Sequence, residues 1–121
     1  MASTPTFRDR VLARLLPFGP VRARAMFGGY GLYLDGTMFA LIAADRLYFK
    51  VDDGNRPEFA AAGSRPFTYR GRDRPIEMSY REVPGAVLDE PPWLADWAAK
   101  AYRAAVAAKA GRSMKRRKAR L

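Results

Sequence analysis

The sequence predicts a single α+β domain, in which one antiparallel β-sheet is covered on one face by helices. Three features of the hydrophobic pattern support this fold class. Apolar residues near the N-terminus recur at helical spacing, those in the middle of the chain alternate with a period of two, and an alanine-rich segment near the C-terminus returns to helical spacing. Helices and sheets must each bury one apolar side, so a sheet with helices on one face is the simplest arrangement.

Length and composition agree with one folded domain. The chain has 121 residues, and 49% of them are hydrophobic, which is too many for a disordered chain. No run approaches the roughly 18 apolar residues of a membrane-spanning helix. The N-terminal segment is charged and leads into no apolar core of the signal-peptide kind, so we expect a cytoplasmic protein.

A first helix is predicted from about Thr4 to Leu16. Thr4 suits the N-cap and Pro5 suits the first turn, where its missing N–H group does no harm. The apolar face of this helix comprises Phe7, Val11, Leu12, Leu15 and Leu16. Two prolines and a glycine within residues 17–20 then end the helix.

The middle of the chain predicts a series of strands and tight turns. The first strand covers residues 21–27, and the Asp-Gly pair at 35–36 between two apolar runs is a strong hairpin signal. A second turn is expected across residues 43–45. It leads into a strand whose core-facing residues should be Leu47, Phe49 and Val51.

Two short motifs in this region have structural interpretations. The glycines of residues 28–31 do not open a helix or precede a Lys-Ser/Thr pair, so we interpret them as a turn or bulge rather than a phosphate-binding loop. Asn55 and Glu58 have the spacing of a capping box, which predicts a short helix that ends at Gly63.

The last third of the chain predicts two strands and a long helix. The strands cover residues 67–69 and 76–83, and Ile76, Met78 and Tyr80 are expected to face inward. Asp89 is expected to cap the helix. Its predicted apolar stripe includes Trp93, Trp97, Ala101, Ala104 and Ala108. We expect a folded domain over residues 1–111, with Gly111 ending the helix, and a poorly ordered basic tail over 112–121.

Composition excludes most enzymatic chemistry. The chain has no cysteine and no histidine, so thiolate nucleophiles and the commonest general base and metal ligand are absent. No serine or lysine has a recognisable activating base beside it in the sequence. We therefore predict a protein that is not an enzyme, with no metal and no cofactor.

The positive net charge favours polyanionic partners or simple self-repulsion in solution. The net charge is +10, and more than half of it lies in the last ten residues, which contain no acid. The basic residues there are Arg112, Lys115, Arg116, Arg117, Lys118 and Arg120. Such a tail could bind nucleic acid without sequence preference, or it could be an inert solubilising segment.

The predicted sheet leaves cations and aromatic rings on its outer face. These residues are Arg22, Arg24, Tyr33, Tyr48, Lys50 and Arg81. A surface of this kind could stack bases and hold phosphates, with the arginines helping the tail. The alternatives are a solvated outer face or one half of a homodimer. A small-ligand-binding module is a further alternative, and it would require a large apolar pocket.

Several runs together form a recognisable pattern: Val21 to Tyr33, Met38 to Ile42, Leu47 to Asp52, Pro66 to Tyr69, Met78 to Tyr80, Val83-Pro84 and the Trp93/Trp97 helix. They resemble the N-terminal domain of the TfoX/Sxy family over about residues 5–108. The resemblance implies an α+β fold with an antiparallel sheet, similar to secretion-chaperone-like folds, and a role without catalysis. The best-known members regulate natural DNA competence and help the cyclic-AMP receptor protein act at a special class of promoters.

The resemblance makes a transcription-associated adaptor with a protein partner the leading hypothesis. This chain ends soon after the first domain, so we expect it to lack the helical C-terminal domain of the full-length regulators. The expected partner-contacting residues are Phe27, Gly28, Gly29, Tyr30, Tyr33, Tyr48 and Lys50. Direct, non-specific nucleic-acid binding through the basic tail, Arg22 and Arg24 is the alternative.

Overall fold

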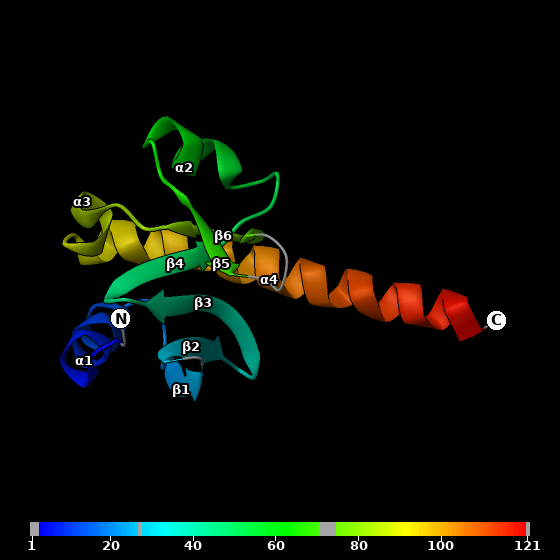
Figure 1. The fold of residues 1–121 in the computed structure, drawn as a ribbon, viewed down its shortest axis with the longest axis horizontal. Helices are drawn as coiled ribbons and strands as arrows, with labels where there is room; N and C mark the ends of the chain where they lie inside the picture. The colour runs from blue at the N-terminus through cyan, green and yellow to red at the C-terminus, as the bar shows by residue number, and fades with distance from the viewer. Residues whose placement is uncertain (1–2, 27, 71–74, 121) are drawn as a thin grey trace.

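The protein folds as a six-stranded antiparallel sheet with helices on one face (Figure 1). The computed structural model describes residues 3–26, 28–70 and 75–120, with residues 69–70, 75–77 and 112–120 described by their backbone alone. The strands are β1 (Arg22–Met26), β2 (Gly29–Leu34), β3 (Thr37–Ala43), β4 (Arg46–Lys50), β5 (Pro66–Arg70) and β6 (Pro75–Glu82). The helices are α1 (Pro5–Arg14), α2 (Arg56–Ala61), α3 (Gly85–Leu88) and α4 (Pro91–Arg120). The strand order is β1-β2-β3-β4-β6-β5, and the predicted α+β class is confirmed.

The start of α1 follows the sequence prediction. Thr4 is the N-cap, its Oγ1 accepts a hydrogen bond from the Phe7 N–H at 3.2 Å, and Pro5 occupies the first turn. The Thr4 N–H also donates to Asp45 Oδ1 at 2.7 Å. The N-cap residue of α1 is therefore hydrogen-bonded to the turn between β3 and β4.

Both predicted hairpins are present as two-residue turns. Asp35 and Gly36 have φ values of 49° and 78°, and Ala44 and Asp45 have φ values of 50° and 55°. Positive φ at both central residues is the geometry whose twist matches that of paired strands. The hairpins therefore set the order of β2, β3 and β4.

The glycines within residues 28–31 do not all lie in the predicted turn. Gly28 has a φ of 77°, which confirms the predicted turn, and its carbonyl accepts a hydrogen bond from the Ser3 N–H at 2.9 Å. Gly29 and Gly31 lie within β2 instead. A Cβ on Gly29 would stand 2.0 Å from the Ile42 carbonyl oxygen. Close approach of two strands, and not a turn, explains the glycine at position 29.

A register shift in the β2–β3 pair places one large ring in the core. Leu32 pairs with Ala40 and Tyr33 pairs with Met38, which leaves Phe39 between the two pairs. Phe39 and Ala40 are both fully buried. A bulge lets neighbouring residues turn toward the same side of a sheet, which alternation alone forbids.

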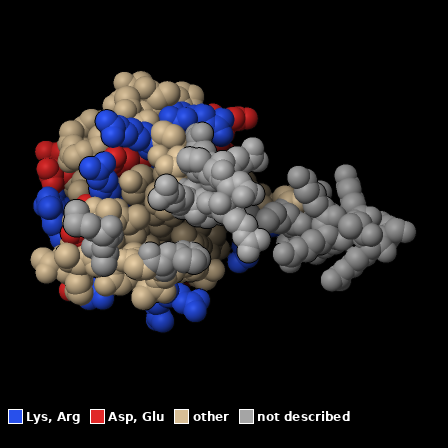
Figure 2. All heavy atoms as spheres, in the orientation of Figure 1, with Lys and Arg blue, Asp and Glu red and all other residues tan. Residues whose placement is uncertain are grey.

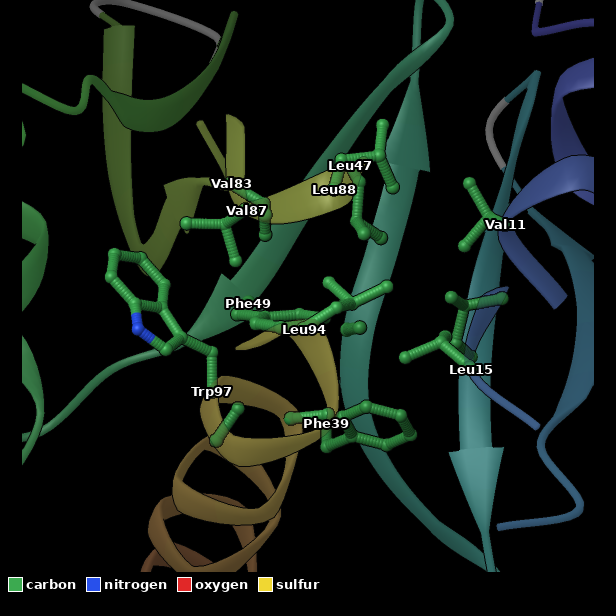
Figure 3. Close-up of a cluster of buried hydrophobic side chains, with 14 of the residues drawn as sticks. Val11, Leu15, Phe39, Leu47, Phe49, Val83, Val87, Leu88, Leu94 and Trp97 are labelled. Carbon is green, nitrogen blue, oxygen red and sulfur yellow. The ribbon is translucent and has the colours of Figure 1, made fainter. Parts of the chain in front are cut away.

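The core lies between the sheet and the helices (Figure 3). The close-up shows Phe49 of β4 beside Leu94 of α4, with Phe39 and Trp97 nearby, and Leu47 of β4 beside Leu88. The predicted inward residues of β4 are thus confirmed. Val11 of α1 and its C-cap residue Leu15 cover the β2 side, while Val83, Val87 and Leu88 complete the core near β6.

The predicted capping box at α2 is wrong, although the helix itself is present. Asn55 precedes α2 but has helical backbone angles, and its side chain makes no capping hydrogen bond. The buried amide instead accepts from the Asp52 N–H at 2.8 Å and donates to the Lys50 carbonyl at 2.9 Å. Asn55 therefore closes the loop after β4. Gly63, with a φ of 69°, ends the α2 segment as predicted.

Replacing Asn55 with alanine should lower the free energy of unfolding by about 2 kcal/mol, because two partly buried backbone groups would lose their partners. Chemical denaturation of the two proteins measures this difference. Asn55→Asp keeps the acceptor and loses the donor, so it should fall between the wild type and Asn55→Ala. Equal stability of all three proteins would contradict the bridging role.

The C-terminal helices differ from the prediction in three ways. A short helix, α3, comes between β6 and α4, and Asp89 is its C-cap rather than the N-cap of α4. Trp93 was expected in the buried stripe but is 47% exposed, while Leu94 is fully buried. The buried stripe follows Leu94, Trp97, Ala98, Ala101 and Ala105, so Trp93 lies at its margin. The backbone of α4 also continues through Gly111, which does not end the helix, to Arg120.

Candidate functional site

The sheet face opposite the helices carries a contiguous group of apolar and aromatic residues. The strand register puts Gly31 beside Leu41 and Leu41 beside Tyr48, and it pairs Tyr33 with Met38. We call this side of the sheet the open face. Its apolar and aromatic residues, with one glycine, are Met26, Gly31, Tyr33, Met38, Leu41, Tyr48 and Phe67. Leu41 is buried yet is not part of the core cluster. The open face therefore has apolar packing of its own.

Basic side chains surround this apolar surface. Arg22 pairs with Tyr33 and Arg24 pairs with Gly31, which puts both exposed arginines on the open face. The guanidinium carbon of Arg24 lies 5.7 Å from the centre of the Tyr33 ring, within cation–π range. Figure 2 shows Lys and Arg side chains at several places around uncharged surface of the domain, with Asp and Glu side chains among them.

The Tyr48 ring is the centre of the β4 part of the open face. Its centre lies 5.0 Å from that of Phe67, in an edge-to-face arrangement. Burial raises the pKa of the Tyr48 hydroxyl, the Glu82 carboxylate raises it further, and Arg46 lowers it. Arg46 Nη1 lies 3.5 Å from Glu82 Oε1. Burial and Glu82 outweigh Arg46, so the pKa of Tyr48 is raised and the hydroxyl stays protonated.

The end of β4 lies beside the place where α4 leaves the sheet. Lys50 pairs with Tyr80, its Nζ lies 5.3 Å from the Tyr80 ring centre, and it donates to Ser79 Oγ. A recess of about 290 Å³ is lined by Gly36, Thr37, Met38, Lys50, Tyr80, Ala105, Ala108 and Lys109. The open face thus continues to the base of the projecting part of α4.

The register of β6 makes one prediction wrong and another correct only in part. Arg81 was expected on the outer face, but it pairs with Phe49 and donates to the Ser64 carbonyl at 3.3 Å, on the helix-covered side. Tyr80 was expected to face the core, and it is buried, but it pairs with Lys50 on the open side. Tyr80 and Val83, the residue after β6, have opposite parities and are both buried, so alternation could not settle the orientation of the strand.

The predicted partner-contacting residues fall into separate places. Tyr33, Tyr48 and Lys50 share the open face. Tyr30 lies on the other side, where it packs against the core and under the Arg8 guanidinium at 5.2 Å. Gly28 lies in the turn after β1, and Gly29 is the first residue of β2. Phe27 lies outside the described residues.

The predicted basic tail continues the α4 backbone. In Figure 1, α4 extends far beyond the sheet to the C-terminus. The side chains of its last cations, Arg112 to Arg120, lie outside the described residues, and the division at residue 111 stays a prediction. Lys109 is the last described cation, at the recess beside Lys50.

The described residues contain no cluster suited to metal binding: three or more His, Cys, Asp or Glu side chains do not converge anywhere in the described part of the chain. In the same part of the chain, no helix is long and apolar enough to cross a membrane.

A second recess lies between α4 and the loop before α2. Its volume is about 400 Å³, and it is lined by Asp52, Gly54, Asn55, Lys100, Arg103, Ala104 and Ala107. Lys100 beside it donates to Glu58 Oε1 at 2.7 Å, and this hydrogen bond raises the pKa of Lys100. The lining combines charged and polar residues with Gly54, Ala104 and Ala107.

A six-stranded antiparallel sheet with helices on one face and aromatic residues on the other defines this protein as a small α+β domain. The sequence matches the family model of the TfoX N-terminal domain over residues 13–105. The chain belongs to this family, which is not a known catalytic family. No curated protein matches the chain.

Proposed function

We propose that this protein is a non-catalytic regulatory adaptor that acts near transcription through protein contacts, in a role related to competence regulation. The observation that carries the proposal is membership of the TfoX N-terminal domain family over residues 13–105. A sheet face that no helix covers, with half-buried apolar residues beside exposed arginines, supports it, because apolar surface rimmed by polar residues is typical of interaction sites.

Deletion of the gene tests this function in the source cell. We expect a limited set of transcripts to change, including those of DNA-uptake genes, and to recover when the full chain is restored. The result that contradicts the proposal is an unchanged transcript profile and unchanged DNA uptake under conditions in which the protein is abundant. Immunoblotting establishes that abundance.

Direct, non-specific binding of nucleic acid is a second candidate, favoured by the length and charge of α4. The helix has 30 residues, which at the usual rise is about 45 Å, and no acidic residue follows Asp96 in the chain. Six cations lie in the last ten residues. Cations on a projecting helix can reach phosphates without competition from neighbouring carboxylates.

Truncation after Gly111 is expected to abolish binding of duplex DNA if this second function is correct. For the full chain, the slope of log affinity against log salt should approach about −5 when all six cations contact phosphates. A full-length variant with these six residues replaced by glutamine serves as a length-matched control and should also fail to bind. Binding that survives both changes would place the nucleic-acid site on the folded domain instead.

A further inference from the structure

The open face has an apolar centre that can adapt its shape. A Cβ on Gly31 would lie 3.1 Å from both Met26 Cε and Tyr33 Cε1, so the glycine lets these two side chains meet above the strand. Met38 lies on the other side of Tyr33 and is also half-buried. Methionines are unbranched and polarizable, and they are frequent on surfaces that accept varied apolar partners.

Cations dominate the margins of this surface. Arg22 and Arg24 lie at its β1 edge, and Arg46 lies at its β4 side with 53% of its side chain exposed. Among the described strand residues on the open face, the acidic one is Glu82, and 30% of its side chain is exposed. Two copies of this face would bring like charges together, which disfavours a homodimer through it and favours an acidic occupant.

The aromatic rings are less suited to stacking bases. Arg24 already covers the Tyr33 ring, and Lys50 lies over the Tyr80 ring. Phe67 packs edge-to-face with Tyr48. Single-stranded nucleic acid is usually held by rings with a free face, so these contacts favour a peptide over a nucleic acid.

We propose that the open face binds an acidic protein segment whose apolar side chains pack on Met26, Tyr33 and Met38 while its carboxylates meet Arg22, Arg24 and Arg46. This inference rests on the proposed adaptor function and names the chemistry of its partner. The positive margin selects the segment by charge, and the methionine-containing centre accepts its apolar residues.

A random peptide library displayed on phage, selected against the full immobilised protein, tests this chemistry. We expect the enriched peptides to be acidic and to contain aromatic or large aliphatic residues. The triple variant Arg22→Glu, Arg24→Glu and Arg46→Glu should weaken binding of these peptides at least about tenfold, and selection against it should enrich basic peptides instead. Met38→Glu, which places a carboxylate within the apolar centre, should also weaken binding.

A charge-matched control separates the open face from general electrostatics. Arg10, Arg56 and Arg103 are exposed and belong to α1, α2 and α4, so replacing all three with glutamate changes the net charge equally without altering the open face. This control should retain peptide binding. Thermal unfolding of each variant establishes that it is folded.

Three outcomes would overturn the inference: enriched peptides without acidic character, equal loss of binding in the control triple variant, or tighter binding of a single-stranded oligonucleotide that the open-face variant abolishes. Acidic peptides that bind the open face in a protein whose deletion leaves transcription unchanged would support the inference and reject the adaptor function. The two proposals can therefore fail separately.

Discussion

Gly29→Ala is expected to lower the free energy of unfolding by at least about 3 kcal/mol, at the upper end of the cost of overpacking. The added Cβ would stand 2.0 Å from the Ile42 carbonyl oxygen and 3.2 Å from its carbon. Both are backbone atoms of β3, so no side-chain rotation relieves the overlap and the β2–β3 pair must separate. Urea denaturation, or loss of native circular dichroism in the variant, measures the effect.

Gly85→Ala is the matched control for this prediction. No atom lies within 4 Å of the Cβ position at Gly85, and its backbone does not require glycine. It begins the short helix α3, where alanine is the better helix former. Stability equal to or above that of the wild type is expected for Gly85→Ala. Similar losses in both variants would contradict the close approach of β2 and β3 at Gly29.

Phe39→Ala should destabilise the protein by about 4 kcal/mol, because it leaves a cavity that several elements border. Phe39 is fully buried, and its ring centre lies 5.3 Å from that of Phe18, 6.0 Å from that of Phe49 and 6.2 Å from that of Tyr102. The loop after α1, strand β4 and helix α4 therefore all lose a contact. Equilibrium unfolding monitored by tryptophan fluorescence measures the change.

Leu16→Ala provides the contrast, since Leu16 is 67% exposed and its truncation should cost less than about 0.5 kcal/mol. Phe39→Leu should lose much less stability than Phe39→Ala. If Phe39→Ala were no more damaging than Leu16→Ala, the bulge would not turn this ring into the core.

Local signals predicted most elements of the fold. The caps and turns of α1 and the two hairpins depend on residues next to one another, such as Thr4 with Pro5 and Asp35 with Gly36, and these predictions were correct. Register and bulges depend on pairing between strands. The position of Phe39, the orientation of Arg81 and the role of Gly29 were therefore not predictable from alternation along one strand.

The candidate site was predictable only in part, for the same reason. Parity along single strands correctly placed Tyr33, Tyr48, Arg22 and Arg24 on the outer face. Met38 and Leu41 were missed because methionine and leucine are normally interpreted as core residues. The signal for this apolar surface was Gly31, because a residue without a Cβ leaves room for the side chains of Met26 and Tyr33 to meet above the strand.

Amide chemical-shift mapping tests the central claim most directly: that the open face is the site of protein contact. One acidic peptide from the selection is titrated into the isotope-labelled full chain. The account predicts that the largest shift changes occur at strand residues of the open face, including Tyr33, Leu41 and Tyr48. Changes confined to α4 beyond Lys109, or to α1 and α2, would contradict it.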